Sequence, residues 1–408
     1  MNTALRVSLS PGQKRHAVAI APLPLLATGG AAVILGESSS DNGQIVPLAP
    51  AAHTLFGPRG ACIAADGSLW VSDTGHHRLL GWPTLPDEDN APAQILIGQP
   101  TFAHEGRNAP SANKSGEPGA ATLNVPAGMT ACGTGIALAD GWNHRVLIWH
   151  QPPRYHNQPA DLVLGQADFH SVAGNRGSDQ PRADTLFWPY GVAWDGARLW
   201  VADSGNRRVL VWNGLPTHNG QAADLVLGQR SFDNRDENAG ATPDASSMRW
   251  PHSIAFLDGK VCVADAGNNR VMVWRQTPTM NGQPCDDLLG QAKSAGVDHN
   301  QGDYWPTAAA LNMPYAITTI GSWLVVADTA TSRLLAWHAD SITGSGAAAQ
   351  RLAAQPDWEA KGDNRWLAAA RDSLCWPFGL CSSADYAVIA DAGNNRVMLW
   401  RWSAEVSA

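Results

Sequence analysis

One spacing recurs along the whole chain: an Asp is followed by an Arg five residues later and by a Trp nine residues later. The pattern occurs six times, and successive copies lie 67, 63, 62, 63 and 63 residues apart. The six copies begin at Asp73, Asp140, Asp203, Asp265, Asp328 and Asp391. A fixed period of this length is the signature of a repeat protein, in which one supersecondary unit is copied and stacked.

Each unit has the pattern of four short strands. In the third unit, apolar runs cover residues 191–194, 199–203, 209–212 and 223–229, and turn residues separate them. Short runs rich in Val, Leu and Trp between such turns predict antiparallel strands. Both faces of the strands are apolar, so each sheet must be covered on both sides. A Pro stands 14 or 15 residues before each Asp, at Pro58, Pro126, Pro189, Pro251, Pro314 and Pro377.

Radial stacking of four-stranded sheets covers both faces, and it is the arrangement of a β-propeller. The last unit has only three strands, but residues 31–37 repeat the outer-strand pattern of residues 160–166. We therefore predict an all-β fold, a six-bladed β-propeller of four-stranded antiparallel blades, with the ring closed by an N-terminal outer strand. The predicted boundaries are an extension at 1–30, the propeller at 31–402 with 31–37 as outer strand of the last blade, blades starting near 58, 126, 189, 251, 314 and 377, and a tail at 403–408.

Charge and hydropathy exclude some classes of protein. The net charge of -8 argues against a general nucleic-acid binder, which normally carries a basic surplus. No run of 18 apolar residues lacks turn formers, so we expect a soluble monomer without a membrane span. We predict a cytoplasmic location. The alternative is export, because Lys14 and Arg15 precede an apolar stretch at 17–27 that faintly resembles a signal peptide.

The residues that recur in every unit are interpreted as structural. The Asp accepts N–H groups of the turn and pairs with the Arg, and a catalytic group is not needed six times. The recurring Trp indicates blade packing. An Asn recurs in each long connection and is expected to close an Asx turn; these are Asn42, Asn108, Asn175, Asn238, Asn300 and Asn364.

Two cysteines occupy equivalent positions in neighbouring blades. Cys62 and Cys381 each stand four residues after the blade Pro, where other units carry Ala or Thr. Only small side chains fit near the axis of a ring, so we interpret both as small hydrophobic residues. A disulfide or a shared metal is the alternative.

The units resemble NHL repeats, which combine a Pro-x-Gly-φ-Ala strand, a strand ending in Val-Ala-Asp, and an Asn-x-Arg turn. The third blade matches closely at residues 188–193 and 199–208, and the likeness extends from about residue 31 to 402. The resemblance implies the propeller fold. For function it implies a range from enzymes to protein-binding and RNA-binding modules.

Three activities of similar propellers can be compared with the residues that follow the blade Pro. These residues are Arg59, Ala127, Tyr190, His252, Tyr315 and Phe378. The resemblance to amidating lyases implies three His zinc ligands at these positions, and one His cannot make that site. Lactonase-like propellers imply acidic calcium ligands, and none of the six residues is acidic. Ubiquitin ligases of this kind carry RING cysteines ahead of the ring, where this chain has none.

The channel mouth is the candidate ligand site. If the lyase geometry applies, five residues converge at one end of the axis, joined by the Trp before three of the Pro: Arg59, Tyr190, His252, Tyr315, Phe378, Trp188, Trp250 and Trp376. One cation and one imidazole in an aromatic cup suit a small anionic or aromatic ligand, or a peptide end. The other interpretation is that Tyr and Phe simply plug the channel.

The predicted function is a non-catalytic binding or scaffold module. It would recognise a protein, a peptide or a small ligand through the channel mouth and the variable loops on the same face. No cofactor and no metal is predicted. The alternative is a lyase or hydrolase with an active site around His252, with or without a metal.

Overall fold

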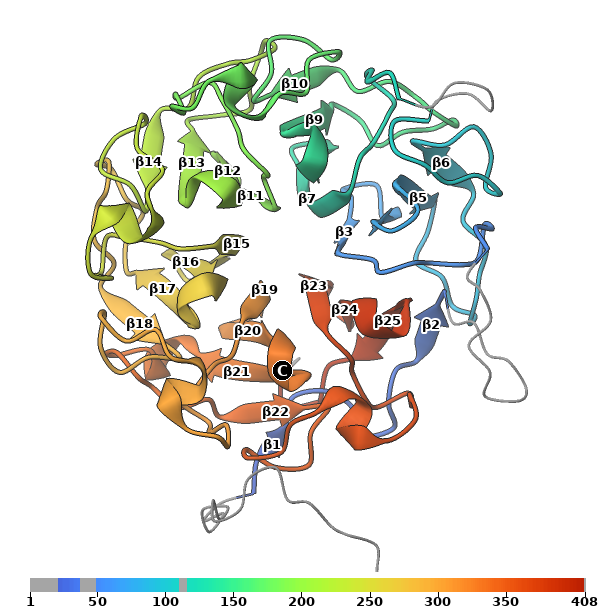
Figure 1. Ribbon diagram of the computed structural model, residues 1–408. Helices are drawn as coiled ribbons and strands as arrows, with labels where there is room; N and C mark the ends of the chain where they lie inside the picture. Colours follow the sequence, from blue (N-terminus) through green and yellow to red (C-terminus); the bar gives the residue numbers. More distant parts are fainter. Residues whose placement is uncertain (1–20, 37–48, 110–115, 407–408) are drawn as a thin grey trace, which may run out of the picture.

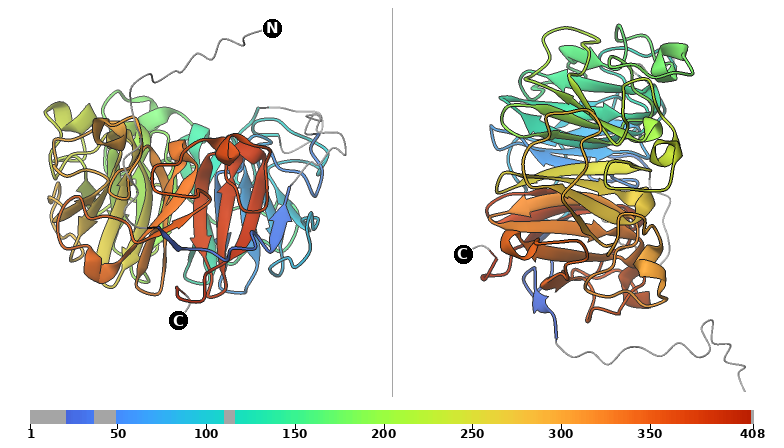
Figure 2. Two further views of the ribbon diagram at one scale, coloured as in Figure 1. Left: turned by 90° about the horizontal axis from the view of Figure 1, so that it is seen from below. Right: turned by 90° about the vertical axis from the view of Figure 1, so that its left-hand side faces the viewer.

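The propeller is seen in a computed structural model that describes residues 21–36, 49–109 and 116–406. Six sheets surround a central axis, and strands run across the thickness of the ring (Figures 1 and 2). No α-helix occurs in these described ranges. The prediction of an all-β propeller with six blades is confirmed.

The blades follow one another along the chain, and each begins with its inner strand. Blade 1 contains β3 (Gly60–Ile63), β4 (Leu69–Asp73), β5 (Arg78–Trp82) and β6 (Ile95–Ile97). Blade 2 contains β7 (Pro126–Cys132), β8 (Gly135–Asp140), β9 (Arg145–Trp149) and β10 (Leu162–Leu164). Blade 3 contains β11 (Gly191–Trp194), β12 (Leu199–Asp203), β13 (Arg208–Trp212) and β14 (Leu225–Leu227).

The second half of the ring repeats this order. Blade 4 contains β15 (Pro251–Leu257), β16 (Lys260–Asp265), β17 (Arg270–Trp274) and β18 (Asp287–Leu289). Blade 5 contains β19 (Pro314–Ile320), β20 (Trp323–Asp328), β21 (Arg333–His338) and β22 (Arg351–Ala353). Blade 6 contains β23 (Pro377–Ser382), β24 (Tyr386–Asp391), β25 (Arg396–Arg401) and, as outer strand, β2 (Val33–Leu35).

Short 3-10 turns connect the strands at one face. Those after the recurring Asp are η1 (Gly141–Asn143), η3 (Ser204–Asn206), η5 (Ala266–Asn268), η7 (Thr329–Thr331) and η10 (Ala392–Asn394). Others lie in the connections, at η2 (Gly174–Gly177), η4 (Glu237–Gly240), η6 (His299–Gly302), η8 (Ala339–Ser341) and η9 (Asp363–Trp366).

Residues near both ends of the chain close the ring. Strand β2 pairs antiparallel with β25, and Ile34 lies opposite Met398. In Figure 1 the blue strand β2 therefore lies beside the red strand β25. The predicted closure by an N-terminal outer strand is confirmed.

A short strand that the sequence did not predict precedes this closure. β1 (Leu23–Pro24) pairs parallel with β22, as a fifth strand at the outer edge of blade 5. Leu25 N–H donates to Leu352 O, and the indole of Trp400 donates to Ala27 O at 2.7 Å. Residues 21–30 therefore lie against blades 5 and 6, which covers part of the outer edge.

The hydrophobic core lies between the blades. Between blades 3 and 4, for example, Trp200 and Val211 pack with Val263 and Trp274, and all four are buried. The indole nitrogen of Trp274 donates to Gln283 O at 3.0 Å, so this buried polar group keeps a partner. Both faces of each sheet are thus covered, as their apolar composition predicts.

A buried polar cluster repeats in every blade. In blade 3, Asp203 Oδ1 accepts the N–H of Phe187 at 2.7 Å, and its Oδ2 accepts from Arg208 Nε at 2.8 Å and from Asn206 at 2.7 Å. Arg208 also donates to three backbone carbonyls, including Thr185 O. The Arg–Asp distances in the six blades are 2.7, 2.8, 2.8, 3.0, 2.8 and 2.8 Å. The structural interpretation of the repeat is confirmed.

The recurring Asn of the connections extends this cluster. Asn175 and Asn206 exchange two side-chain hydrogen bonds, of 3.0 and 2.8 Å. Equivalent pairs join Asn108 to Asn143, Asn238 to Asn268 and Asn364 to Asn394. In blade 5, Thr331 stands in place of the second Asn, and the Oδ1 of Asn300 has no hydrogen-bond partner among the described residues. Asn42 lies outside the described residues.

A further hydrogen bond joins most neighbouring blades. The residue before the blade Pro donates its N–H to the side chain that precedes the recurring Arg of the previous blade. For Val125, Trp188, Met313, Trp376 and Gly57, the acceptors are His77, His144, Asn269, Ser332 and Asn395, at 3.0, 2.9, 2.8, 3.3 and 2.8 Å. These five donors have φ between 53° and 55°, a left-handed conformation that is uncommon outside Gly.

The boundary between blades 3 and 4 lacks this hydrogen bond. Arg207 occupies the acceptor position, and a guanidinium cannot accept. The N–H of Trp250 instead donates to Asp265 of its own blade at 3.2 Å. The inter-blade hydrogen bond therefore depends on an acceptor that only five of the six turns supply.

Candidate functional site

The residues after the blade Pro meet at one end of the axis, and we call this group the hub: Arg59, Tyr190, His252, Tyr315 and Phe378. The rings follow one another from blade 3 to blade 6, with centroids 4.3, 4.2 and 4.8 Å apart. The Arg59 guanidinium lies 5.0 Å from the Phe378 ring centroid, which continues the series into blade 1. The sixth position holds Ala127, which leaves room for the larger side chains.

The hub fills the axis of the ring. Tyr190 and Tyr315 come from blades that are not neighbours, yet their ring centroids are 5.9 Å apart. The two rings must therefore extend toward the centre of the channel. The rings therefore meet near the axis, where they also present polar atoms.

His252 is held in one orientation. Its Nδ1 lies 2.8 Å from Trp250 O and therefore carries the proton, which leaves Nε2 as an acceptor. Burial lowers the pKa of this imidazole to about 4, and the charge of Arg59 acts in the same direction. His252 is therefore neutral at pH 7, and Nε2 can accept a proton or a hydrogen bond.

Two polar groups of the hub lack a bonding partner in the described part of the chain: the hydroxyl of Tyr190 lacks a hydrogen-bond partner, and the guanidinium of Arg59 lacks a carboxylate. The Tyr190 hydroxyl is buried and has no hydrogen-bond partner among the described residues, and the whole residue is 3% exposed. Burial raises the pKa of this phenol, so it remains a hydrogen-bond donor. Arg59 has no carboxylate partner within the described part of the chain.

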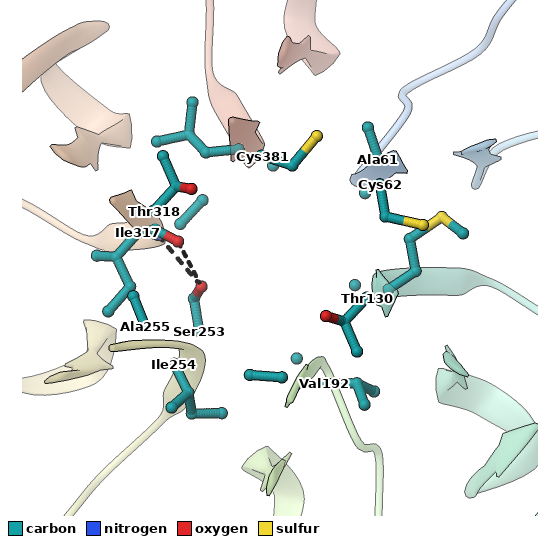
Figure 3. Close-up of a pocket in the computed structure, with 18 of the residues that line it drawn as sticks. Ala61, Cys62, Thr130, Val192, Ser253, Ile254, Ala255, Ile317, Thr318 and Cys381 are labelled. Atoms are coloured by element: carbon teal, nitrogen blue, oxygen red, sulfur yellow. Dashed lines mark hydrogen bonds between the residues drawn. The ribbon is translucent and has the colours of Figure 1, made fainter. Parts of the chain in front are cut away.

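A cavity of about 270 Å³ extends from the hub along the inner strands. Figure 3 shows it between the strands, with Cys62, Cys381, Thr130 and Thr318 among the labelled residues around it. Most of the surface that the wall exposes is polar, although none of the described residues that line it is Asp or Glu. Arg59 is the sole charged side chain among them.

The two channel cysteines are consistent with the interpretation as small core residues. Cys62 and Cys381 are both free thiols, and no disulfide joins them. Burial raises the pKa of Cys381 to about 12 and that of Cys62 in the same direction. Both thiols therefore stay protonated at neutral pH, which makes them weak nucleophiles and weak metal ligands.

The described residues contain no group of three or more His, Cys, Asp or Glu side chains that could hold a metal ion. His252 is the single hub residue with a ligand nitrogen. No helix in the described ranges is long and apolar enough to cross a membrane.

Comparison with known proteins identifies the repeat. The family model described as NHL repeat matches residues 57–82 in blade 1 and 248–274 in blade 4. These matches lie on the six-bladed ring described above. The chain is an NHL-repeat β-propeller.

Solved structures share the fold of this NHL propeller at low sequence identity. A structural genomics protein of unknown function from Bacteroides thetaiotaomicron is similar with a TM-score of 0.51 and 11% identity, over 92% of this chain and 75% of that chain. Virginiamycin B lyase from Staphylococcus aureus gives a TM-score of 0.43 and 10% identity, over 90% and 98%. No curated protein matches the chain significantly in sequence. The first of these two likenesses shows the fold alone, and neither carries a statement about activity.

The three Trp that were predicted to join the channel mouth lie apart from the cavity. Trp188, Trp250 and Trp376 are 38%, 36% and 50% exposed, and none lines the channel. They precede the blade Pro on the same face of the NHL propeller as the hub, and the inter-blade hydrogen bond fixes Trp188 and Trp376 there. The structure thus separates the eight candidates into the hub, in which Tyr190 and His252 are buried, and an exposed surface formed by the three Trp.

Two further exposed aromatic residues on this face were not predicted. Phe56 is 47% and Trp142 is 57% exposed. Trp142 stands in the turn after Asp140, at a position where four other blades have Gly. In those blades a neighbouring residue lies so close that a side chain would not fit, as Phe187 does at Gly205. In blade 2 the equivalent neighbour is Asn124, which leaves space. The sequence does contain a signal for this exposed residue, because Trp142 occupies a position where most units have Gly.

Proposed function

We propose that the NHL propeller is a binding or scaffold module that holds a protein or peptide partner on the face bearing the exposed aromatic residues. We call this surface the aromatic face; it comprises Phe56, Trp142, Trp188, Trp250 and Trp376. Five exposed aromatic side chains on one face support the proposal, because water solvates them poorly and because Trp is enriched at the energetic centres of protein interfaces.

The scaffold is suited to this role. Each of these side chains sits beside a blade Pro or an Asp turn, where the buried Asp–Arg cluster holds the backbone. A rigid surface loses little conformational entropy on binding, so more of the contact energy appears as affinity. We propose that the protein acts as a monomer and does not bind nucleic acid, in line with its net charge of -8.

The test is capture of a partner from the native host by the purified protein. Trp142→Ala and Trp376→Ala should each weaken the captured partner's affinity about tenfold or more, as expected for interface hot spots. Tyr155→Ala is the matched control, because Tyr155 is 59% exposed but follows the opposite end of β9 and so lies on the other face. Equal capture by all three variants would contradict the proposal.

An enzyme is the second candidate, a lyase or hydrolase at the hub. The observation that favours it is the neutral His252, whose Nε2 can act as a general base beside Tyr190 and Tyr315. Metal analysis of the purified protein distinguishes the two functions. Stoichiometric bound zinc, iron or calcium would favour the enzyme, whereas metal-free protein that captures a partner favours the binding module.

A further inference from the structure

The end of the channel at the hub carries positive charge and an unpaired hydrogen-bond donor. The guanidinium of Arg59 lies 5.0 Å from the Phe378 ring centroid, and Arg59 lines the cavity. The Tyr190 hydroxyl lines the cavity without a partner among the described residues. A buried polar group usually has a partner, and an exception indicates a missing ligand or water.

The wall below the hub has a different character. Val192, Ile254 and Ile317 lie one position beyond the small residues next to the hub, and all three are buried and line the cavity. Thr130, Thr318 and the two thiols add weakly polar atoms without charge. The cavity therefore offers a cationic end and an uncharged body whose exposed surface is mainly polar.

We propose that this channel binds a small organic acid as its carboxylate anion. The carboxylate lies at Arg59 and accepts a hydrogen bond from the Tyr190 hydroxyl, and the rest of the small acid lies in the uncharged body of the cavity. A guanidinium binds carboxylate through two parallel hydrogen bonds, which gives both affinity and orientation. The volume of about 270 Å³ is at the lower limit for ligand pockets, which restricts the ligand to a small acid or the C-terminal residue of a peptide.

The neighbouring His252 supplies neither charge nor a hydrogen-bond donor for this ligand at pH 7. Because it is neutral at pH 7, it adds no second charge, and its Nε2 accepts rather than donates. Arg59 therefore sets the charge preference alone. This inference goes beyond the partner proposed for the aromatic face, and it does not depend on that partner.

Isothermal titration calorimetry with benzoate and hexanoate tests the site, with benzamide and hexanamide as controls of similar shape without charge. We expect one saturable site for the acids and at least tenfold weaker binding of the amides. Arg59→Gln should weaken acid binding at least tenfold, and Arg59→Lys less. Arg401→Gln is the matched control, because Arg401 also lies over an aromatic ring, 4.7 Å from the Tyr386 centroid, but outside the cavity.

A second titration distinguishes the two possible sources of the carboxylate, which are a free organic acid and the C-terminus of a peptide. The peptide Ala-Ala-Phe with a free C-terminus is titrated beside the same peptide with an amidated end. Tighter binding of the free peptide than of benzoate assigns the site to peptide ends, and weaker binding assigns it to free acids. Equal binding of acids and amides, or unchanged binding by a folded Arg59→Gln variant, would overturn the proposal.

The two proposals can fail separately. Trp142→Ala and Trp376→Ala change the aromatic face but not the lining of the cavity, so both variants should bind benzoate like the original chain. Loss of partner capture with intact benzoate binding supports both proposals. Intact capture in these variants refutes only the aromatic face.

Discussion

The Asp–Arg cluster and the hub both contain buried polar atoms, but they differ in how these atoms are used. Around Asp203, both carboxylate oxygens and the three nitrogens of Arg208 have partners within the chain. In the hub, the Tyr190 hydroxyl has none among the described residues. The Asp–Arg pair is also the same in all six blades, whereas the hub has a different residue in almost every blade. Repetition indicates a structural role for the pair, and variation at the axis indicates a site for a ligand.

The largest expected effect comes from breaking one cluster. Arg208→Met would leave Asp203 as an uncompensated buried charge and should lower the free energy of unfolding by about 3–5 kcal/mol. Arg182→Met, which removes a half-exposed ion pair with Asp184, should change it by less than about 1 kcal/mol. Urea unfolding of both variants measures the difference, and similar values for the two would refute the structural role of the cluster.

The hub predicts a dependence of stability on pH. The unfolded chain protonates His252 below pH of about 6.5, whereas the folded chain does so only below about 4. The unfolded state therefore binds more protons between these values, and stability falls as the pH drops through this window, by up to about 3 kcal/mol. His252→Gln removes this contribution. The free energies of unfolding of the two proteins should diverge between pH 7 and pH 4.5, and parallel curves would contradict the buried neutral imidazole.

The smallest effect has the opposite sign. Tyr190→Phe removes a hydroxyl that burial has separated from water without a hydrogen bond in return. Without ligand, this change should raise the free energy of unfolding by about 1 kcal/mol. With saturating benzoate the original protein should recover that difference. Thermal unfolding with and without benzoate measures both, and a destabilised variant in the absence of ligand would show that the hydroxyl serves the fold.

The sequence predicts those features of the fold that follow from the repeat of about 63 residues. Because every unit has the same register, the residues after the six Pro had to meet near the axis, and residues 31–37 had to supply the missing strand. β1 was not predicted, because two residues in a parallel pair carry no pattern of their own. The state of His252 and Tyr190 depends on the packing of side chains from four blades, and spacing contains no information about it.

Trp188 was predicted to lie at the channel mouth, because residue spacing does not show which way a side chain points. The Trp precedes its Pro by one residue and Tyr190 follows by one, so the sequence places them together. The left-handed backbone at Trp188, held by His144, turns its side chain to solvent. Such a conformation is rare for a bulky residue, so general preferences argue against it.

Pairing of β2 with β25 has a consequence for synthesis on the ribosome. Ile34 is translated long before its partner Met398. Until Met398 is made, the segment Val33–Leu35 can pack its side chains against blade 1, but its edge toward β25 has no strand partner. Unpaired edges promote aggregation, so this edge is open to pairing with other chains until blade 6 has been made.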